Sequence, residues 1–89
     1  MNTIKLEVLA RPIRRGVLGK AVSTSWQPAI FKNGKWLLDL PAGVDATAAI
    51  EAAAIATRAI NESADVYAVA NGMSADFIAL AAEIVREAR

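Results

Sequence analysis

The sequence predicts an α+β domain, with a small antiparallel sheet of about three strands in residues 3–40 that is covered on one face by two or three helices from residues 45–88. Two observations point to this order. Residues 1–43 hold all three prolines, four of the five glycines and both tryptophans, whereas residues 44–89 hold sixteen alanines. The first half alternates apolar and polar residues with the period of a strand, and the second half repeats its apolar residues with the period of a helix. At this length we expect one domain over residues 1–89.

Residues 3–10 are predicted to form the first strand. Charged and apolar residues alternate there, as they do in a strand with one buried face. The face expected to point inward carries Ile4, Leu6, Val8 and Ala10. Arg11-Pro12 is expected to end the strand, because proline cannot donate to a strand ladder.

The segment that follows is basic and rich in turn-forming residues. Arg14-Arg15-Gly16, together with Gly19, is expected to form a basic loop. Residues 17–25 leave two alternatives open, because their apolar residues fit a short strand whereas Ser23-Thr24-Ser25 is typical of a loop. The pairing of this segment with the other strands is therefore not predicted.

The dipeptide Asn33-Gly34 lies between two apolar runs and predicts a β-hairpin with a two-residue turn. Both residues tolerate the positive φ that a type I′ turn requires at its two central positions. The expected register has three pairs: Lys32 with Lys35, Phe31 with Trp36, and Ile30 with Leu37. The face expected to meet the helices carries Ala29, Phe31, Trp36, Leu38 and Leu40. The opposite face is expected to carry Ile30, Lys32, Lys35, Leu37 and Asp39, with Trp26 on the same side if Pro28 introduces no bulge.

Two longer helices are expected in the alanine-rich half. Pro41-Ala42-Gly43 breaks the last strand, and Asp45 or Thr47 is expected to cap a helix over residues 46–60. Ser74 is expected to cap the final helix, which has a continuous apolar stripe.

The stretch between these helices, Asn61 to Met73, fits two structures. One is a short helix that starts near Ser63 or Asp65 and ends at Gly72, and the other is a fourth strand over Val66 to Val69. We favour the helix.

The side chains that most often carry catalysis are absent from the sequence. It has no histidine and no cysteine, so the commonest general base, the commonest metal ligand and the thiol nucleophile are missing. The acidic residues form no pair at a metal-binding spacing. Gly16 to Lys20 lacks the spacing of a phosphate-binding loop, and a serine nucleophile with Lys20 as its base has no support in the local pattern. We therefore predict that the protein is not an enzyme and has no cofactor and no metal site.

Residues 64–82 have the steric rhythm of a helix-turn-helix, with Gly72 at the turn. DNA recognition would place the N-terminal side chains of the second helix against phosphates. Those side chains include Asp76 and Glu83 and no basic residue. We interpret the pattern as two helices packed at a glycine corner.

The charge of the chain is divided between its two halves. Residues 1–43 carry seven basic and two acidic side chains, and residues 44–89 carry three basic and seven acidic ones, although the total charge is only +1. Recognition of a partner is therefore expected on the basic half. The residues predicted to bind a partner are Arg11, Arg14, Arg15, Trp26, Ile30, Lys32, Lys35 and Leu37.

We expect a small non-enzymatic protein–protein interaction module, a regulator or inhibitor of a larger complex of the kind that phages and other mobile elements encode. Its expected partner is a protein with an acidic surface, or a second copy of the chain in a homodimer. The alternative is a nucleic-acid-binding module that uses the basic strands, and a third interpretation is that the hairpin lysines only block edge pairing. The sequence shows no signal peptide and no membrane-spanning run, which predicts a cytoplasmic protein without a membrane partner.

Overall fold

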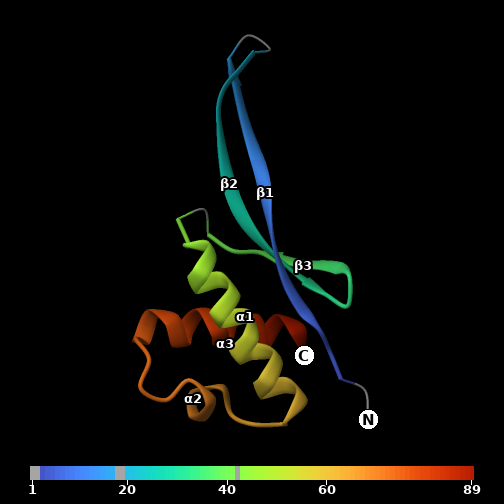
Figure 1. The fold of residues 1–89 in the computed structure, drawn as a ribbon, viewed down its shortest axis with the longest axis vertical. Helices are drawn as coiled ribbons and strands as arrows, with labels where there is room; N and C mark the ends of the chain where they lie inside the picture. Colours follow the sequence, from blue (N-terminus) through green and yellow to red (C-terminus); the bar gives the residue numbers. More distant parts are fainter. Residues whose placement is uncertain (1–2, 18–19, 42) are drawn as a thin grey trace.

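The computed structural model describes residues 3–17, 20–41 and 43–89, and for residues 11–17 and 20–26 it describes the backbone alone. The described strands form one antiparallel sheet in the order β1-β2-β3, and the helices follow and pack against it (Figure 1). This confirms the expected α+β fold. The elements are β1 (Leu6–Val17), β2 (Lys20–Lys32), β3 (Lys35–Asp39), α1 (Ala46–Asn61), α2 (Val66–Val69) and α3 (Ala75–Ala88).

Strands β1 and β2 are much longer than the sequence predicts. The expected end at Arg11-Pro12 and the expected loop at Arg14-Arg15-Gly16 are both wrong, since all of these residues lie within β1. Ser23-Thr24-Ser25 lies within β2, so the loop interpretation of that segment is also wrong, and Gly19 is outside the described residues. Proline is tolerated because β1 is an edge strand, where one side of the backbone needs no partner.

The two long strands form a ribbon that extends beyond the helices (Figure 1). Their register runs unbroken from Leu6 opposite Lys32 to Arg15 opposite Ser23, so Pro28 introduces no bulge into this pair. Strand β3 pairs only with Ala29–Lys32 of β2. The outer part of β2 therefore pairs with β1 alone. The molecule is elongated as a result, with extents of 49 × 29 × 17 Å.

The hairpin between β2 and β3 has the predicted turn but a different register. Asn33 and Gly34 have φ values of 52° and 84°, as the two central positions of the turn require. Beyond the turn, a register shift makes Ile30 pair with Leu38 instead of Leu37. Leu37 is thus an extra residue in β3, which is how a β-bulge forms.

This shift reverses which face of the sheet meets the helices. A one-residue slip moves every side chain beyond it to the other face. Ile30 and Leu40 have 0% of their surface exposed, whereas Trp36 is 54% exposed. The prediction that Ile30 faces away from the helices and Trp36 toward them is therefore wrong. Leu38 and Leu40 are buried as expected, and Ile30 joins them because the bulge brings it to the same face.

The core lies between this inner face of the sheet and helices α1 and α3. The buried residues of helix α1 are all alanines, which allows the helix to lie close to both β1 and α3, and the larger Ile55 and Ile60 pack against the core at its margin. The buried residues of α1 are Ala49, Ala52, Ala53, Ala56 and Ala59. Helix α3 contributes the larger Ile84 and Val85. The alanine-rich composition of the second half is thus used for close helix packing.

The starts of the helices follow the predicted signals with one exception, and the expected end of the short helix at Gly72 is wrong, since α2 ends at Val69. Ser74 Oγ accepts a hydrogen bond from the Phe77 amide at 3.3 Å, as an N-cap does. Asp65 caps α2 through the amide of Tyr67, which confirms the helix in preference to a fourth strand. Asp45 occupies the N-cap position of α1 but makes no side-chain capping bond.

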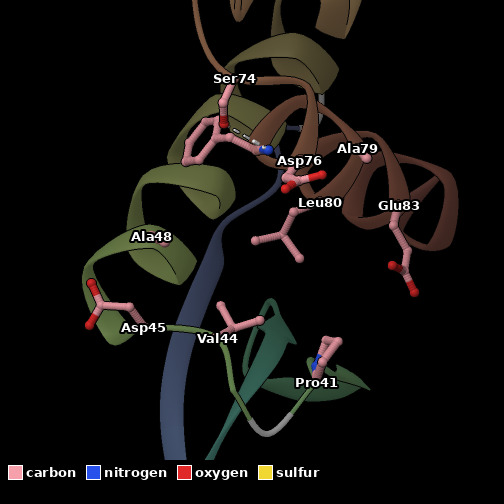
Figure 2. Close-up of a pocket in the computed structure, with 10 residues that line it drawn as sticks. Pro41, Val44, Asp45, Ala48, Ser74, Asp76, Ala79, Leu80 and Glu83 are labelled. Atoms are coloured by element: carbon pink, nitrogen blue, oxygen red, sulfur yellow. Dashed lines mark hydrogen bonds between the residues drawn. The ribbon is translucent and has the colours of Figure 1, made fainter.

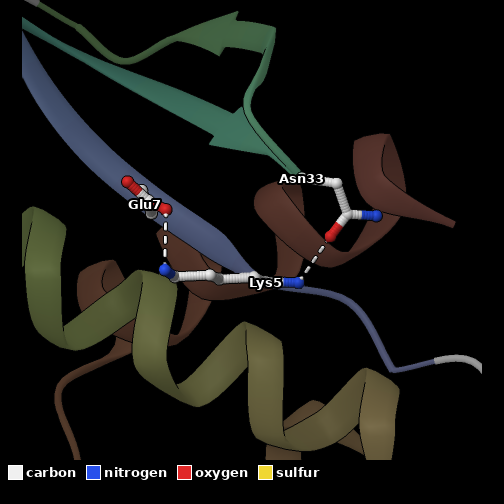
Figure 3. Close-up of polar contacts among 3 residues, drawn as sticks. All are labelled: Lys5, Glu7 and Asn33. Carbon is white, nitrogen blue, oxygen red and sulfur yellow. Dashed lines mark hydrogen bonds and ion pairs between the residues drawn. The ribbon is translucent and has the colours of Figure 1, made fainter.

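Polar contacts fasten the N-terminal segment at two places. The Lys5 amide donates to Asn33 Oδ1 at 2.9 Å (Figure 3). The Asn33 amide donates to the Lys5 carbonyl oxygen at 2.8 Å. Asn61 on α1 exchanges two hydrogen bonds with the Ile4 backbone, at 2.8 and 3.0 Å. The first strand is thereby held to both the hairpin turn and α1. Within the described part of the chain, no helix is long and apolar enough to cross a membrane.

Candidate interaction surface

The face of the sheet that points away from the helices carries exposed apolar side chains. Phe31 pairs with both Glu7 and Trp36 across the strands, so these three side chains share one face. Leu9, two residues after Glu7, lies on the same face and is 49% exposed. We call this surface the open sheet face; its residues are Glu7, Leu9, Phe31, Trp36 and Asp39.

Polar contacts at the edges of the open sheet face fix its geometry. The indole Nε1 of Trp36 donates to Asp39 Oδ1 at 3.0 Å, which holds the ring in one orientation along β3. Lys5 Nζ, just before β1, and Glu7 Oε1, within β1, form an ion pair at 3.1 Å (Figure 3). Both of these side chains are largely exposed, so the pair contributes little to stability. The result is an apolar and aromatic surface bordered by charge, which is the composition of many protein interfaces.

The residues that the sequence predicts to bind a partner do not lie together on one surface of the structure. Ile30 is fully buried, and Leu37 is half-buried and packs against the core. Lys32 Nζ donates to the Ala88 carbonyl oxygen at 2.7 Å, near the C-terminal end of α3. A cation at that end is favoured by the helix dipole, which gives Lys32 a structural role. The placement of these three residues on an open face is therefore corrected.

The remaining predicted residues lie along the hairpin turn and the ribbon. Lys35 is exposed beside the turn. The backbones of Arg11, Arg14 and Arg15 lie in β1, and that of Trp26 lies in β2 opposite Pro12, while their side chains are outside what the structure describes. The arginines are thus on an extended ribbon and not in a loop.

The sequence places Phe31 and Trp36 toward the helices and groups Leu9 with Lys5 and Glu7 on the other side of the first strand, and none of Leu9, Phe31 and Trp36 is among the residues predicted to bind a partner. Their signal is the strand alternation itself, which correctly groups Phe31 with Trp36. The alternation does not say which of the two faces is buried. The bulge at Leu37 decides which face is buried, and no residue type in the hairpin predicts this bulge.

A second candidate surface is a groove on the helix side of the molecule. It has a volume of about 490 Å³ and lies between the segment before α1, the first turns of α1 and the N-terminal part of α3. In Figure 2 the side chains of Val44 and Leu80 point toward each other across it, and Asp76 and Glu83 stand on the α3 side. The full lining is Pro41, Val44, Asp45, Ala48, Ser74, Asp76, Phe77, Ala79, Leu80 and Glu83.

The lining of this groove holds three carboxylates and no basic residue. Asp45, Asp76 and Glu83 form no ion pair with any side chain that the structure describes. They also do not form a cluster that could hold a metal ion, and no other such cluster occurs among the described residues. The groove therefore combines an apolar floor with uncompensated negative charge.

No family model, no curated protein and no solved structure matches this chain.

Proposed function

We propose that the protein is a non-enzymatic protein–protein interaction module that binds a partner through the open sheet face, as a small regulator or inhibitor of a larger complex. The observation that carries the proposal is the exposure of Trp36 and Leu9 on the sheet face that points away from the helices. Leu9, Phe31 and Trp36 are neighbours across the paired strands, so they form one apolar patch, and such a patch is more informative than a single exposed side chain. A cytoplasmic location is part of the proposal and is compatible with a chain that lacks cysteine.

The residue types on the open sheet face support this function. Tryptophan is enriched among the few interface residues that dominate binding energy. The hydrogen bond from Trp36 to Asp39 fixes the ring before binding, which reduces the entropy lost when a partner docks. Charged residues at the edge, including Glu7, give the rim that such interfaces usually have.

The experiment compares capture of host proteins by three forms of the protein. Trp36→Ala should lose the captured partner, since loss of a central tryptophan commonly costs about 2 kcal/mol, or roughly 30-fold in Kd. Ile50→Ala is the matched control, because Ile50 is 57% exposed on α1, away from the sheet. Mass spectrometry of the captured proteins gives the readout, and circular dichroism checks that each variant is folded. Equal capture by wild type and Trp36→Ala would show that the open sheet face is not the site.

A second function has support from the ribbon. Residues 11–26 carry Arg11, Arg14, Arg15 and Lys20 and no acidic residue. A two-stranded ribbon fits the major groove of B-DNA, and its cations would contact phosphates.

Titration of labelled single- and double-stranded DNA and RNA at two salt concentrations tests the nucleic-acid alternative. It requires affinity that falls steeply with salt and is lost in the double variant Arg14→Ala/Arg15→Ala. Flat titrations for every nucleic acid would eliminate it.

A further inference from the structure

The groove between the 41–45 segment, α1 and α3 has the chemistry of a site for a cationic, partly apolar chain segment. Val44, Phe77 and Leu80 supply an apolar floor, and the three carboxylates supply the charge. Carboxylates without a cation beside an apolar surface attract a segment that offers both kinds of contact. A metal ion is a poor occupant, because the described acids do not gather into a candidate metal site.

The ribbon of this same chain has the complementary composition. Its outer part contains four basic residues and no acidic one, together with apolar residues such as Ile13 and Val17. The ribbon extends away from the helices (Figure 1), so its outer part is directed away from the groove of its own copy. The groove of a second copy is open to it.

The ribbon also lacks support within one copy. Beyond Pro28, toward its outer end, β2 pairs only with β1, and an isolated two-stranded ribbon is marginally stable in water. A contact with another chain would stabilise it. If each copy inserts its ribbon into the groove of the other, both contacts are identical and the assembly closes as a symmetric dimer.

We propose that two copies of this chain associate by reciprocal exchange, with the basic β1–β2 ribbon of each copy bound in the acidic groove of the other. The inference rests on the proposed function, which is that the protein acts by binding other proteins. It adds that one of these partners is a second copy of the same chain. The open sheet face lies on the other side of the sheet from the groove and takes no part in this contact.

A charge-swap experiment on the full chain tests the dimer. Molar mass is measured by light scattering over a range of concentrations at low and high salt. Wild type should approach twice the 9.4 kDa of one chain, with a dimer Kd that rises at least ten-fold with salt. The ribbon variant Arg14→Glu/Arg15→Glu and the groove variant Asp76→Arg/Glu83→Arg should each be monomeric, because like charges then meet. Mixing the two variants should restore the dimer, since both contacts again join opposite charges.

The matched control changes the same amount of charge outside the groove. Glu51→Arg/Glu87→Arg alters two exposed acids on α1 and α3 and should dimerise as wild type does. Recovery on mixing requires folded partners, so it also excludes misfolding as the cause of the monomeric variants.

Several results would overturn the proposal. They are a monomeric wild type at all concentrations, a dimer that survives the groove variant, or two monomeric variants that fail to recover on mixing. These outcomes are separate from the capture test, in which only Trp36 is changed. A monomeric wild type whose partner capture still depends on Trp36 would leave the proposed function standing and remove only the dimer.

Discussion

Replacement of Ile30 by alanine tests the orientation of the sheet, on which the open sheet face depends. The substitution removes three carbon atoms from a side chain with 0% exposure. At about 0.8 kcal/mol for each buried CH₂-sized group, the transfer term is roughly 2.4 kcal/mol, and the cavity left behind raises the expected loss to about 2–5 kcal/mol. For a domain of this size the melting temperature should fall by at least about 8 °C.

The matched control is Leu9→Ala, which removes the same number of carbon atoms from a side chain that is 49% exposed on the other face. Its expected cost is below about 1 kcal/mol, because little buried surface is lost and strand propensity changes only modestly. Urea unfolding followed by circular dichroism measures both. If Ile30→Ala costs no more than Leu9→Ala, then Ile30 is not a core residue and the assignment of the open sheet face fails with it.

Three further substitutions test the contacts that hold the fold together. Ala56→Leu should lower the free energy of unfolding by about 1–3 kcal/mol, because it overpacks a fully buried site. The control Ala54→Leu, on the exposed side of α1, should change it by less than about 0.5 kcal/mol. Equal urea midpoints for the two variants would contradict the close packing of α1. Asn61→Ala removes two hydrogen bonds to the N-terminal segment and should lower the free energy of unfolding by about 1–3 kcal/mol. Amide hydrogen exchange in that segment should also become faster. Unchanged exchange would show that these two bonds do not hold the segment in place. Gly34→Ala should cost about 1–2 kcal/mol in thermal melts because φ is +84° there, and Gly43→Ala, which has open space and no positive φ, is its control.

The local signals in the sequence predict the second half of the molecule well. Ser74 and Asp65 cap the helices that follow them, although α2 ends at Val69 and Gly72 lies in the turn beyond it. These features depend on one or two residues and their own backbone, so a sequence pattern is sufficient to locate them. The turn at Asn33-Gly34 belongs to the same class.

The sheet is harder to predict because its pairing depends on residues far apart in the chain. Pro12 and Ser23-Thr24-Ser25 resemble loop residues locally, but pairing between β1 and β2 overrides their preference. The bulge at Leu37 is a similar case, since it is set by how β3 packs on the core. Because the face of every later residue in β3 depends on that bulge, one unpredicted residue moved the candidate site from Ile30 and Leu37 to Phe31 and Trp36.

The positions of the two proposed contact surfaces make them compatible. The groove lies among the helices, and the open sheet face lies on the opposite side of the sheet. A ribbon-exchanged dimer would therefore leave both copies of Trp36 accessible, and the assembly would present two equivalent partner-binding faces. Two linked faces bind a partner with repeated sites more tightly than one does, because the second contact is intramolecular. The ribbon and groove variants should then weaken capture of a multisubunit partner, without any change at the open sheet face, while capture of a single-site partner stays the same.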